Sequence, residues 1–335
     1  MHRRRAPGGS ASAMRCADRG KKVALIEART RNGSGGTCVN RGCIPTKALM
    51  ASANLYASIK EAAAFGINVD MSAVTVDFKA IDKRKNQVIN GLGFGLEAML
   101  WKKARGITVI KGRARLLDAH TIEVDNGKTK KTVTAENIVI AVGSEPAEIP
   151  AFHVDHEKII TSNEIMDFSR PLPGSIVIIG SGAIGLEYGH IYSIYGVDVT
   201  IVEMMPNLVP ALHDTEITDA VKASLEKRGV KVKCGSGIAA VEVQPDGKVK
   251  STLANGEELF SDEVLVAIGR TLNTRGMGLE EVGVKMEKNG QIVTDEHMRT
   301  SVPNSFRRGR HHGGHSAFRQ GAAPGPGDSR DHRRQ

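Results

Sequence analysis

The stretch from residue 175 to residue 203 restricts the fold more strongly than any other part of the chain. A short apolar run at 175–179 leads into the pattern Gly180-Ser-Gly182-Ala-Ile-Gly185, and a second apolar run at 197–202 ends in Glu203. This order matches a strand, a glycine-rich turn, a helix and a parallel strand that ends in an acid. In such a unit the glycines let a pyrophosphate reach the helix N-terminus. We therefore predict an α/β dinucleotide-binding unit that uses Gly180, Gly182, Gly185 and Glu203.

The acid also indicates which dinucleotide binds. A carboxylate at residue 203 can accept hydrogen bonds from both ribose hydroxyls and repels a 2′-phosphate. Residues 204–207 include no arginine that could hold such a phosphate. The sequence therefore favours NAD over NADP.

A damaged copy of the same pattern stands at the N-terminus. Gly9 and Glu27 are 18 residues apart, the same separation as between the third glycine and the acid of the later copy. In this register Arg4 and Ala6 stand where the first two glycines should be, and too few residues precede them for a first strand. Glu27 is predicted to bind a ribose; the alternative is a solvated acid at a strand end.

The other elements follow from periodicity and capping. An amphipathic helix is predicted over 79–101, although Gly91, Gly93 and Gly95 weaken it and allow a kink or a break. Further helices are expected over 10–22, 183–195 and 214–228. Strands are expected at 23–27, 107–110, 121–124, 137–142, 230–234, 239–243, 249–253, 258–260 and 264–268.

Residues 35–47 hold two cysteines in the spacing C-x4-C and a lysine one helical turn beyond the second, in the string GGTCVNRGCIPTK. Both cysteines are expected near the start of a helix that runs past Lys47. Four cysteines in 335 residues are too few for the disulfide framework of a small secreted protein. A disulfide in this chain is therefore expected to be catalytic rather than structural; the alternative is a pair of buried structural thiols.

This string, together with the two nucleotide-binding patterns, resembles the class I pyridine nucleotide-disulfide oxidoreductases, and among them most closely the dihydrolipoyl dehydrogenases. The resemblance covers about residues 7–304. It implies an α/β fold with two Rossmann-like, three-layer nucleotide-binding domains. Residues 1–145 and 271–304 would form the FAD-binding domain, residues 146–270 the NAD-binding domain, and residues 305–335 a disordered basic tail. The family's C-terminal dimerisation domain is expected to be absent.

The resemblance also implies roles for individual residues. Cys38 would exchange with the substrate. Cys43 would form a disulfide with Cys38 and lie against the flavin. Lys47 would lie near the reactive flavin nitrogen and pair with Glu187. The alternatives are that Lys47 is a surface lysine and that Glu187 is an ordinary helix acid. The FAD-binding residues would be Gly8, Gly9, Glu27, Thr37, Lys47, Gly112 and Gly143. The NAD-binding residues would be Gly180, Gly182, Gly185, Glu203 and Gly269.

The implied activity is the oxidation of dihydrolipoyl groups through FAD, with NAD as acceptor. The implied partners are a dihydrolipoyl-carrying acyltransferase of a 2-oxo acid dehydrogenase complex and a second copy of the chain. The compartment would be the cytoplasm or, alternatively, a mitochondrial or plastid matrix. Two other classes stay open: a non-catalytic NAD-binding remnant, and a sister enzyme such as mercuric or glutathione reductase.

Three departures from the family pattern predict impaired turnover. Arg4 and Ala6 interrupt the first glycine turn, and Arg310 occupies the position of an aspartate that binds the ribityl chain of FAD in the family. The interface domain, which supplies the family's His–Glu base, is also missing. Because both ends are rich in Arg, Gly and Pro, we expect them to derive from a shifted reading frame or a misplaced start.

The formal net charge of +9 does not indicate a nucleic-acid partner. Residues 1–22 carry +6 and residues 301–335 carry +5, so the remaining chain is nearly neutral, at −2. No aromatic residues interleave with these charges as in a nucleic-acid platform, and no apolar run reaches the length of a membrane span. His311, His312 and His315 lack a matching acid or cysteine, so no metal site is predicted.

Overall fold

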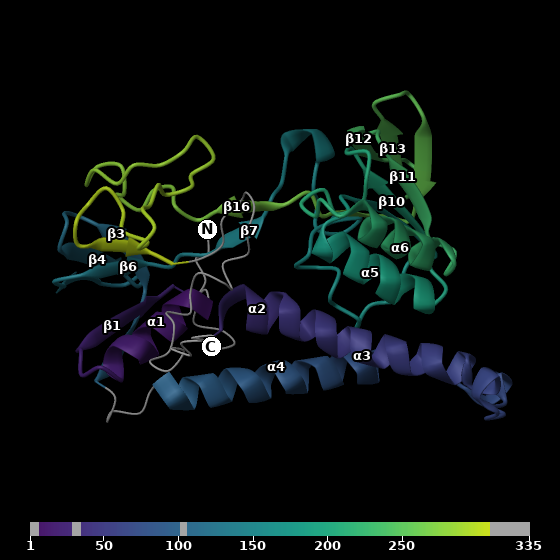
Figure 1. Ribbon diagram of the computed structural model, residues 1–335, viewed down its shortest axis with the longest axis horizontal. Helices are drawn as coiled ribbons and strands as arrows, with labels where there is room; N and C mark the ends of the chain where they lie inside the picture. The colour runs from purple at the N-terminus through teal and green to yellow at the C-terminus, as the bar shows by residue number, and fades with distance from the viewer. Residues whose placement is uncertain (1–6, 29–34, 101–105, 309–335) are drawn as a thin grey trace, which may run out of the picture. The chain divides into compact units, whose positions relative to one another are not determined.

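The computed structural model describes residues 7–28, 35–100 and 106–308 (Figure 1). The chain divides into two compact units. The first unit contains residues 1–30, 100–143 and 272–335, and the second contains residues 31–99 and 144–271. Each unit is described by itself below.

The second unit is built on a five-stranded parallel sheet in the order β11-β10-β9-β15-β8. Its strands are β8 (Ile159–Ile160), β9 (Ser175–Ile179), β10 (Asp198–Glu203), β11 (Lys231–Cys234) and β15 (Glu263–Val266). Strand β9 is central and almost wholly apolar, as expected of a strand buried on both faces. Ile176 and Ile178 point into one core and Val177 and Ile179 into another, because successive side chains of a strand alternate between its faces.

Two further layers cover this sheet. Helices α5 (Ala183–Ile194) and α6 (Thr215–Glu226) lie on the face of Ile176 and Ile178 (Figure 1). The opposite face packs against an antiparallel sheet of β12 (Ile238–Val243), β13 (Val249–Leu253) and β14 (Glu258–Ser261). The predicted strands and helices of this region are therefore present, with ends shifted by one or two residues.

Helices α2 (Gly36–Arg41), α3 (Cys43–Lys60) and α4 (Phe78–Leu100) precede the sheet. The middle of α3 packs on α5 through Leu49 and Ala53, which are fully buried in the same core. Helix α4 runs beside α3 (Figure 1), and Arg84 donates a hydrogen bond to the carbonyl of Ala48. The glycines of α4 do not break it: it is one continuous helix. Short 3-10 turns at Ala62–Phe65, Met71–Ala73 and Pro150–Phe152 complete the unit.

The first unit contains α1 (Pro7–Ala17) and several short strands. Strand β1 (Val23–Glu27) pairs in parallel with β2 (Ile107–Lys111), and β3 (Arg113–Leu116), β4 (Thr121–Asp125) and β5 (Lys130–Thr134) form an antiparallel sheet. Strand β6 (Ile138–Ile140) pairs in parallel with β17 (Ser305–Arg307). The core joins β3, β4 and β6 to apolar side chains of the returning segment, among them Met277, Leu279 and Ile292. Strands β7 (Ser144–Pro146) and β16 (Arg270–Leu272) pair where the chain passes between the units.

Two expectations about chain organisation need correction. Residues 305–307 are not part of a disordered tail: they form strand β17, and Ser305 and Arg307 are buried. Residues 35–99, predicted to belong with the first unit, pack with the second unit, because α3 shares a core with α5. Within the described ranges, no helix is long and apolar enough to span a membrane.

Candidate functional site

The glycine-rich turn between β9 and α5 is shaped by two glycines that the fold itself requires. Gly180 has φ +100°, and a Cβ there would lie 2.7 Å from the carbonyl oxygen of Ala267. A Cβ at Gly185 would collide with the carbonyl oxygen of Gly180. Both positions therefore need glycine for backbone packing, as the sequence pattern predicts.

Gly182 is different, because neither its backbone angles nor its contacts with the described chain require a glycine. It lies directly before α5 with φ −70°, which any residue adopts, and no atom of the described chain lies within 4 Å of its would-be Cβ. A position that tolerates a side chain sterically but carries none fits a ligand that approaches the backbone. The helix N-terminus beside it suits a pyrophosphate. The second unit therefore fits a dinucleotide.

Glu203 lies at the end of β10 and is buried. Its Oε2 accepts hydrogen bonds from the backbone N–H of Ser181 at 2.9 Å and from the Ser181 hydroxyl at 2.7 Å. Its Oε1 accepts one from the N–H of Met205 at 3.0 Å. A carboxylate has about four acceptor sites, so the chain itself occupies most of them. About one acceptor site is left for a ligand, and the hydrogen bonds of Glu203 with ribose hydroxyls stay a prediction.

Ser181 is the residue that sequence reasoning missed. It is fully buried between the two glycines, and its hydroxyl also accepts a hydrogen bond from the N–H of Val209 at 3.1 Å. The only signal in the sequence is a hydroxyl residue at a variable position of the glycine pattern. Gly269, also predicted to bind NAD, has φ +131°, and its carbonyl accepts a hydrogen bond from Ala147.

The cysteine segment forms two helices rather than one. Thr37 and Cys38 lie in α2, and Cys43 begins α3 after Gly42, whose φ and ψ of −150° and −112° interrupt the helix. A Cβ at Gly42 would lie 3.0 Å from the carbonyl oxygen of Thr37, so the break is tight. Cys38 is half-buried and Cys43 exposed, and the structure contains no disulfide between these two described residues. Their pairing stays a prediction.

Lys47 and Glu187 meet as the resemblance implied. Lys47, one turn into α3, places its Nζ 2.5 Å from Oε1 of Glu187 on α5, and the lysine side chain is 57% exposed. Next to them, the hydroxyls of Thr46 and Tyr188 lie 3.2 Å apart. Burial raises the pKa of Tyr188 far above its usual value, so this hydroxyl stays protonated. The Thr46–Tyr188 and Lys47–Glu187 pairs both join α3, which begins with Cys43, to α5, which follows the glycine turn.

The FAD-binding set predicted from the sequence is divided between the units. Thr37 and Lys47 belong to the second unit, and the other five residues belong to the first. In the first unit, Glu27 ends β1 and is buried. Gly112 and Gly143 have φ of +153° and +71°. A Cβ at Gly112 would clash with Val124 and Asp125, so packing alone explains that glycine.

Gly8 and Gly9 lie inside α1, not in a turn before it. Gly9 faces strand β6's end, with its would-be Cβ 3.4 Å from that of Ala141. The space beside Gly8 is taken by Arg308: its Cγ would lie 3.0 Å from a Cβ at Gly8, and its Nη1 donates to Ser12 Oγ at 3.1 Å. An arginine side chain of the same unit therefore packs along the first turns of α1.

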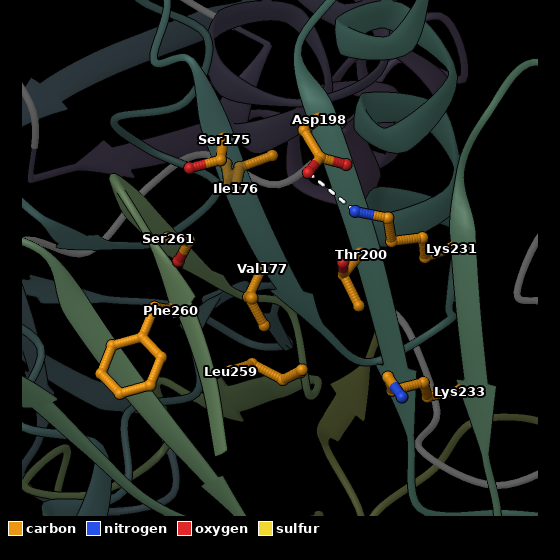
Figure 2. Close-up of a pocket in the computed structure, with 10 residues that line it drawn as sticks. All are labelled: Ser175, Ile176, Val177, Asp198, Thr200, Lys231, Lys233, Leu259, Phe260 and Ser261. Carbon is orange, nitrogen blue, oxygen red and sulfur yellow. Dashed lines mark hydrogen bonds and ion pairs between the residues drawn. The ribbon is translucent and has the colours of Figure 1, made fainter. Parts of the chain in front are cut away.

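A small cavity of about 130 Å³ lies at the other end of the second unit's sheet (Figure 2). It is lined by the amino-terminal parts of β9 and β10 together with β11 and β14. Its ammonium groups are already paired: Lys231 with Asp198 at 2.8 Å and Lys233 with Glu257 at 2.7 Å. It is smaller than ligand pockets usually are and far along β9 from the glycine turn, so it is not the dinucleotide site.

Several predicted positions cannot be placed. Arg4, Ala6, Arg310 and the histidines at 311, 312 and 315 lie outside the described residues. In residues 7–28, 35–100 and 106–308, no three His, Cys, Asp or Glu side chains gather as a metal site would need.

The sequence profile described as "Pyridine nucleotide-disulphide oxidoreductase" matches residues 6–309. The chain is 37% identical to dihydrolipoyl dehydrogenase of Geobacillus stearothermophilus over 302 residues, which are 90% of this chain and 62% of that protein. It is 36% identical to the mitochondrial dihydrolipoyl dehydrogenase of Pisum sativum, over 90% of this chain and 60% of that protein. The chain thus spans about three fifths of the length of these relatives.

Solved structures agree with these matches. The HOCl-induced flavoprotein disulfide reductase RclA from Escherichia coli, as its Cu(II) complex, superposes with a TM-score of 0.78 at 26% identity, over 91% of this chain and 64% of that one. LpdA from Mycobacterium tuberculosis superposes with a TM-score of 0.82 at 24% identity, over 93% and 68%, and supports the fold alone. The predicted fold class and the predicted resemblance are confirmed.

Proposed function

Because the chain belongs to the pyridine nucleotide-disulphide oxidoreductase family, we propose that it acts as a flavin-dependent disulfide oxidoreductase of the dihydrolipoyl dehydrogenase type. Dihydrolipoyl dehydrogenases and flavoprotein disulfide reductases use FAD and NAD(H). The proposed reaction is the oxidation of a dihydrolipoyl dithiol, with Cys38 and Cys43 as the redox pair and NAD as the final acceptor.

The observation that carries the proposal is the contact between Lys47 and Glu187. These residues are 140 positions apart in the chain, and each lies in a motif that family resemblance singles out. Their contact fixes the helix that begins with Cys43 against the helix that begins at the glycine turn. A buried structural role for the two cysteines fits poorly, because Cys43 is exposed.

The thiol chemistry needs only the two cysteines and the substrate. One sulfur of the dihydrolipoyl dithiol attacks the disulfide at Cys38 and forms a mixed disulfide, while the Cys43 sulfur leaves as a thiolate. The second substrate sulfur then displaces Cys38. The substrate gives up two electrons and two protons and becomes a cyclic disulfide, and the protein disulfide becomes a dithiol. Exposure of Cys43 and partial exposure of Cys38 leave both sulfurs reachable.

The second unit supplies what an NAD site needs. Gly182 leaves the helix N-terminus open, Gly180 and Gly185 hold the turn tight, and Glu203 stands at the end of the adjacent strand. The nicotinamide, when bound, accepts a hydride. The residues of the chain would bind the pyrophosphate and one ribose hydroxyl and exclude a 2′-phosphate.

The fit to FAD is only partial in the first unit. Gly9 and Glu27 stand where the family pattern puts a glycine and a ribose-binding acid, but Arg308 packs against Gly8 and donates to Ser12 in the first turns of α1. Flavin occupancy is the property on which turnover by this chain depends.

The partner and compartment follow from the relatives only in general terms. We infer an association with a 2-oxo acid dehydrogenase complex, through its dihydrolipoyl-carrying acyltransferase, and a homodimer, since both belong to the dihydrolipoyl dehydrogenase family. The relatives include bacterial proteins and a mitochondrial one. The proposed compartment is the cytoplasm, with a mitochondrial or plastid matrix as the alternative.

The test uses the purified full chain supplied with FAD. We expect a flavin absorbance band that remains after gel filtration, and reduction of NAD⁺ that depends on dihydrolipoamide. Independently of turnover, lipoamide should protect Cys38 and Cys43 from alkylation, because it oxidises them to the disulfide. The variants Cys38→Ser and Cys43→Ser should lose both the turnover and the protection.

The matched control is Cys16→Ser, since Cys16 is an exposed thiol in the first unit. It should keep the turnover and the protection of the other two cysteines. Alkylation of Cys38 and Cys43 that is unaffected by lipoamide would refute their redox role. A colourless protein that still binds NADH would leave the dinucleotide site in place and remove the flavin-dependent activity.

A further inference from the structure

The hydroxyl of Ser181 ties together three segments of the second unit. It donates to Oε2 of Glu203 at the end of β10 and accepts from the N–H of Val209, 28 residues further along the chain. Ser181 itself lies in the glycine turn and is fully buried. The glycine turn, the strand end and the loop after it therefore share one buried hydroxyl.

The loop is held in a conformation that needs such a tie. Val209 has φ +49°, in the left-handed region that β-branched residues strongly avoid. Leu208 beside it is buried in the core, whereas Met204, Met205 and Leu212 of the same loop are 69%, 45% and 41% exposed. The hydrogen bond from the Val209 N–H to Ser181 is the polar contact that joins this strained residue to the turn.

Glu203 is fixed by the same arrangement. Three donors, two from Ser181 and one from Met205, hold its carboxylate, which is 6% exposed. An acid held only at its base could rotate away from an approaching phosphate. This carboxylate cannot rotate without leaving the Ser181 hydroxyl and N–H unpaired in a buried site, which is costly.

We infer that Ser181 is a specificity-determining residue of the dinucleotide site: its hydroxyl holds Glu203 in place so that a ribose hydroxyl is accepted and a 2′-phosphate is rejected. The inference rests on the proposed NAD-binding function. The negative charge of Glu203 supplies the repulsion, and Ser181 prevents the carboxylate from avoiding it. Ser181 therefore acts as a positioning residue, through Glu203.

The other end of β9 offers a matched control. There, the N–H and hydroxyl of Ser175 donate to Oδ2 of Asp262 at 2.8 and 2.9 Å. This is the same double contact of a serine with one carboxylate oxygen that Ser181 makes with Glu203. It lies at the amino-terminal end of the strand, away from the glycine turn. Ser175→Ala removes an equivalent hydrogen bond without touching the proposed site.

The experiment measures dissociation constants of NADH and NADPH for the full chain by fluorescence titration. In the wild type, NADPH should bind more weakly than NADH. In Ser181→Ala, the dissociation constant of NADPH divided by that of NADH should fall by about tenfold, which is the effect of losing one hydrogen bond to a charged group. Ser175→Ala should keep the wild-type ratio. Ser181→Cys, which fills the site but donates weakly, should give the same fall if Ser181→Ala does not fold.

A second measurement does not depend on any ligand. Hydrogen–deuterium exchange should show a protected amide at Val209 in the wild type and in Ser175→Ala, and faster exchange over residues 204–212 in Ser181→Ala. An unchanged NADPH-to-NADH ratio in a folded Ser181 variant would overturn the inference. A wild type that binds neither dinucleotide would instead overturn the proposed function, so the two failures are distinguishable.

Discussion

Helices α5 and α1 differ in what lies at their amino-terminal ends. Each has glycines at or just before its start, and each precedes a strand that ends in a buried acid, Glu203 in the second unit and Glu27 in the first. At α5, Gly182 faces open space. At α1, Arg308 packs against Gly8 and donates to Ser12.

The difference shows that a shared sequence plan does not ensure a shared binding capacity. A helix N-terminus carries a partial positive charge, so an arginine placed there is unfavourable unless other contacts compensate. At α1, packing against Gly8 and the hydrogen bond to Ser12 hold the arginine beside the first turns of the helix. At α5 nothing of this kind stands in the way among the described residues. Among the described residues, the backbone before α5 is therefore open at Gly182, whereas Arg308 fills the space beside Gly8 in α1.

Replacing Gly185 by alanine should have the largest effect. The new Cβ would collide with the carbonyl of Gly180, so either the turn or the start of α5 must move. We expect a loss of roughly 3 kcal/mol in the free energy of unfolding, measured by urea denaturation, and loss of NADH binding. The control is Gly91→Ala in α4, where nothing lies within 4 Å. That variant should gain about 0.5–1 kcal/mol in stability.

Replacing Gly182 by alanine should separate ligand binding from stability. Since the backbone angles suit alanine and no described atom is near, unfolding should change by less than about 1 kcal/mol. NADH affinity, measured by titration, should fall by at least about tenfold, because the methyl group holds the pyrophosphate away from the helix N-terminus. Unchanged NADH affinity would show that the openness of this position has no relation to a ligand.

The sequence predicted the second unit well because its signals are local. The short apolar run at 175–179 and the spacing of Gly180, Gly182 and Gly185 identify the strand, the turn and the helix without reference to distant residues. The hydrogen bonds of Ser181 with Glu203 and Val209 were missed because these residues come close to Ser181 only after the chain has folded. The contact between Lys47 and Glu187 was expected only from the family resemblance.

The first unit was predicted less well for a related reason. Strand β17 contains Arg307 and is followed by Arg308, so the local composition suggested a tail, yet the strand's backbone pairs with β6. Burial lowers the pKa of Arg307, as expected of a cation removed from water. The grouping of residues 35–99 was missed because helical periodicity shows that α3 has an apolar face but not which partner covers it.

Replacing Arg308 by alanine tests whether the Arg308 side chain limits FAD binding by the first unit. Removing the side chain frees the start of α1, so FAD should bind between about two- and tenfold more tightly, measured by flavin fluorescence on the full chain. Arg115→Ala is the control, because Arg115 is an exposed arginine of the same unit that pairs with Glu281. Weaker FAD binding in Arg308→Ala would mean that Arg308 contacts the diphosphate instead of excluding it.

The smallest effect concerns pH and again contrasts the units. His190 on α5 bonds through Nε2 to Asn54 on α3 at 2.8 Å. Partial burial, and then the charge of Arg228, lower its pKa. The folded state therefore takes up the proton less readily than the unfolded state, whose histidine pKa is about 6.5. Stability from this group is complete above that pH and declines as the pH falls below it.

Thermal denaturation between about pH 7.5 and 5 should therefore show a falling midpoint that is flatter in His190→Gln. The first unit supplies the control: His120 bonds to the carbonyl of Ala135, outside α5 and its packing. His120→Gln should keep the wild-type slope. A flatter dependence of the midpoint on pH in His120→Gln but not in His190→Gln would contradict this prediction. The acid sensitivity would then belong to the first unit, and the α3–α5 contact that supports the cysteine segment would not respond to pH in this range.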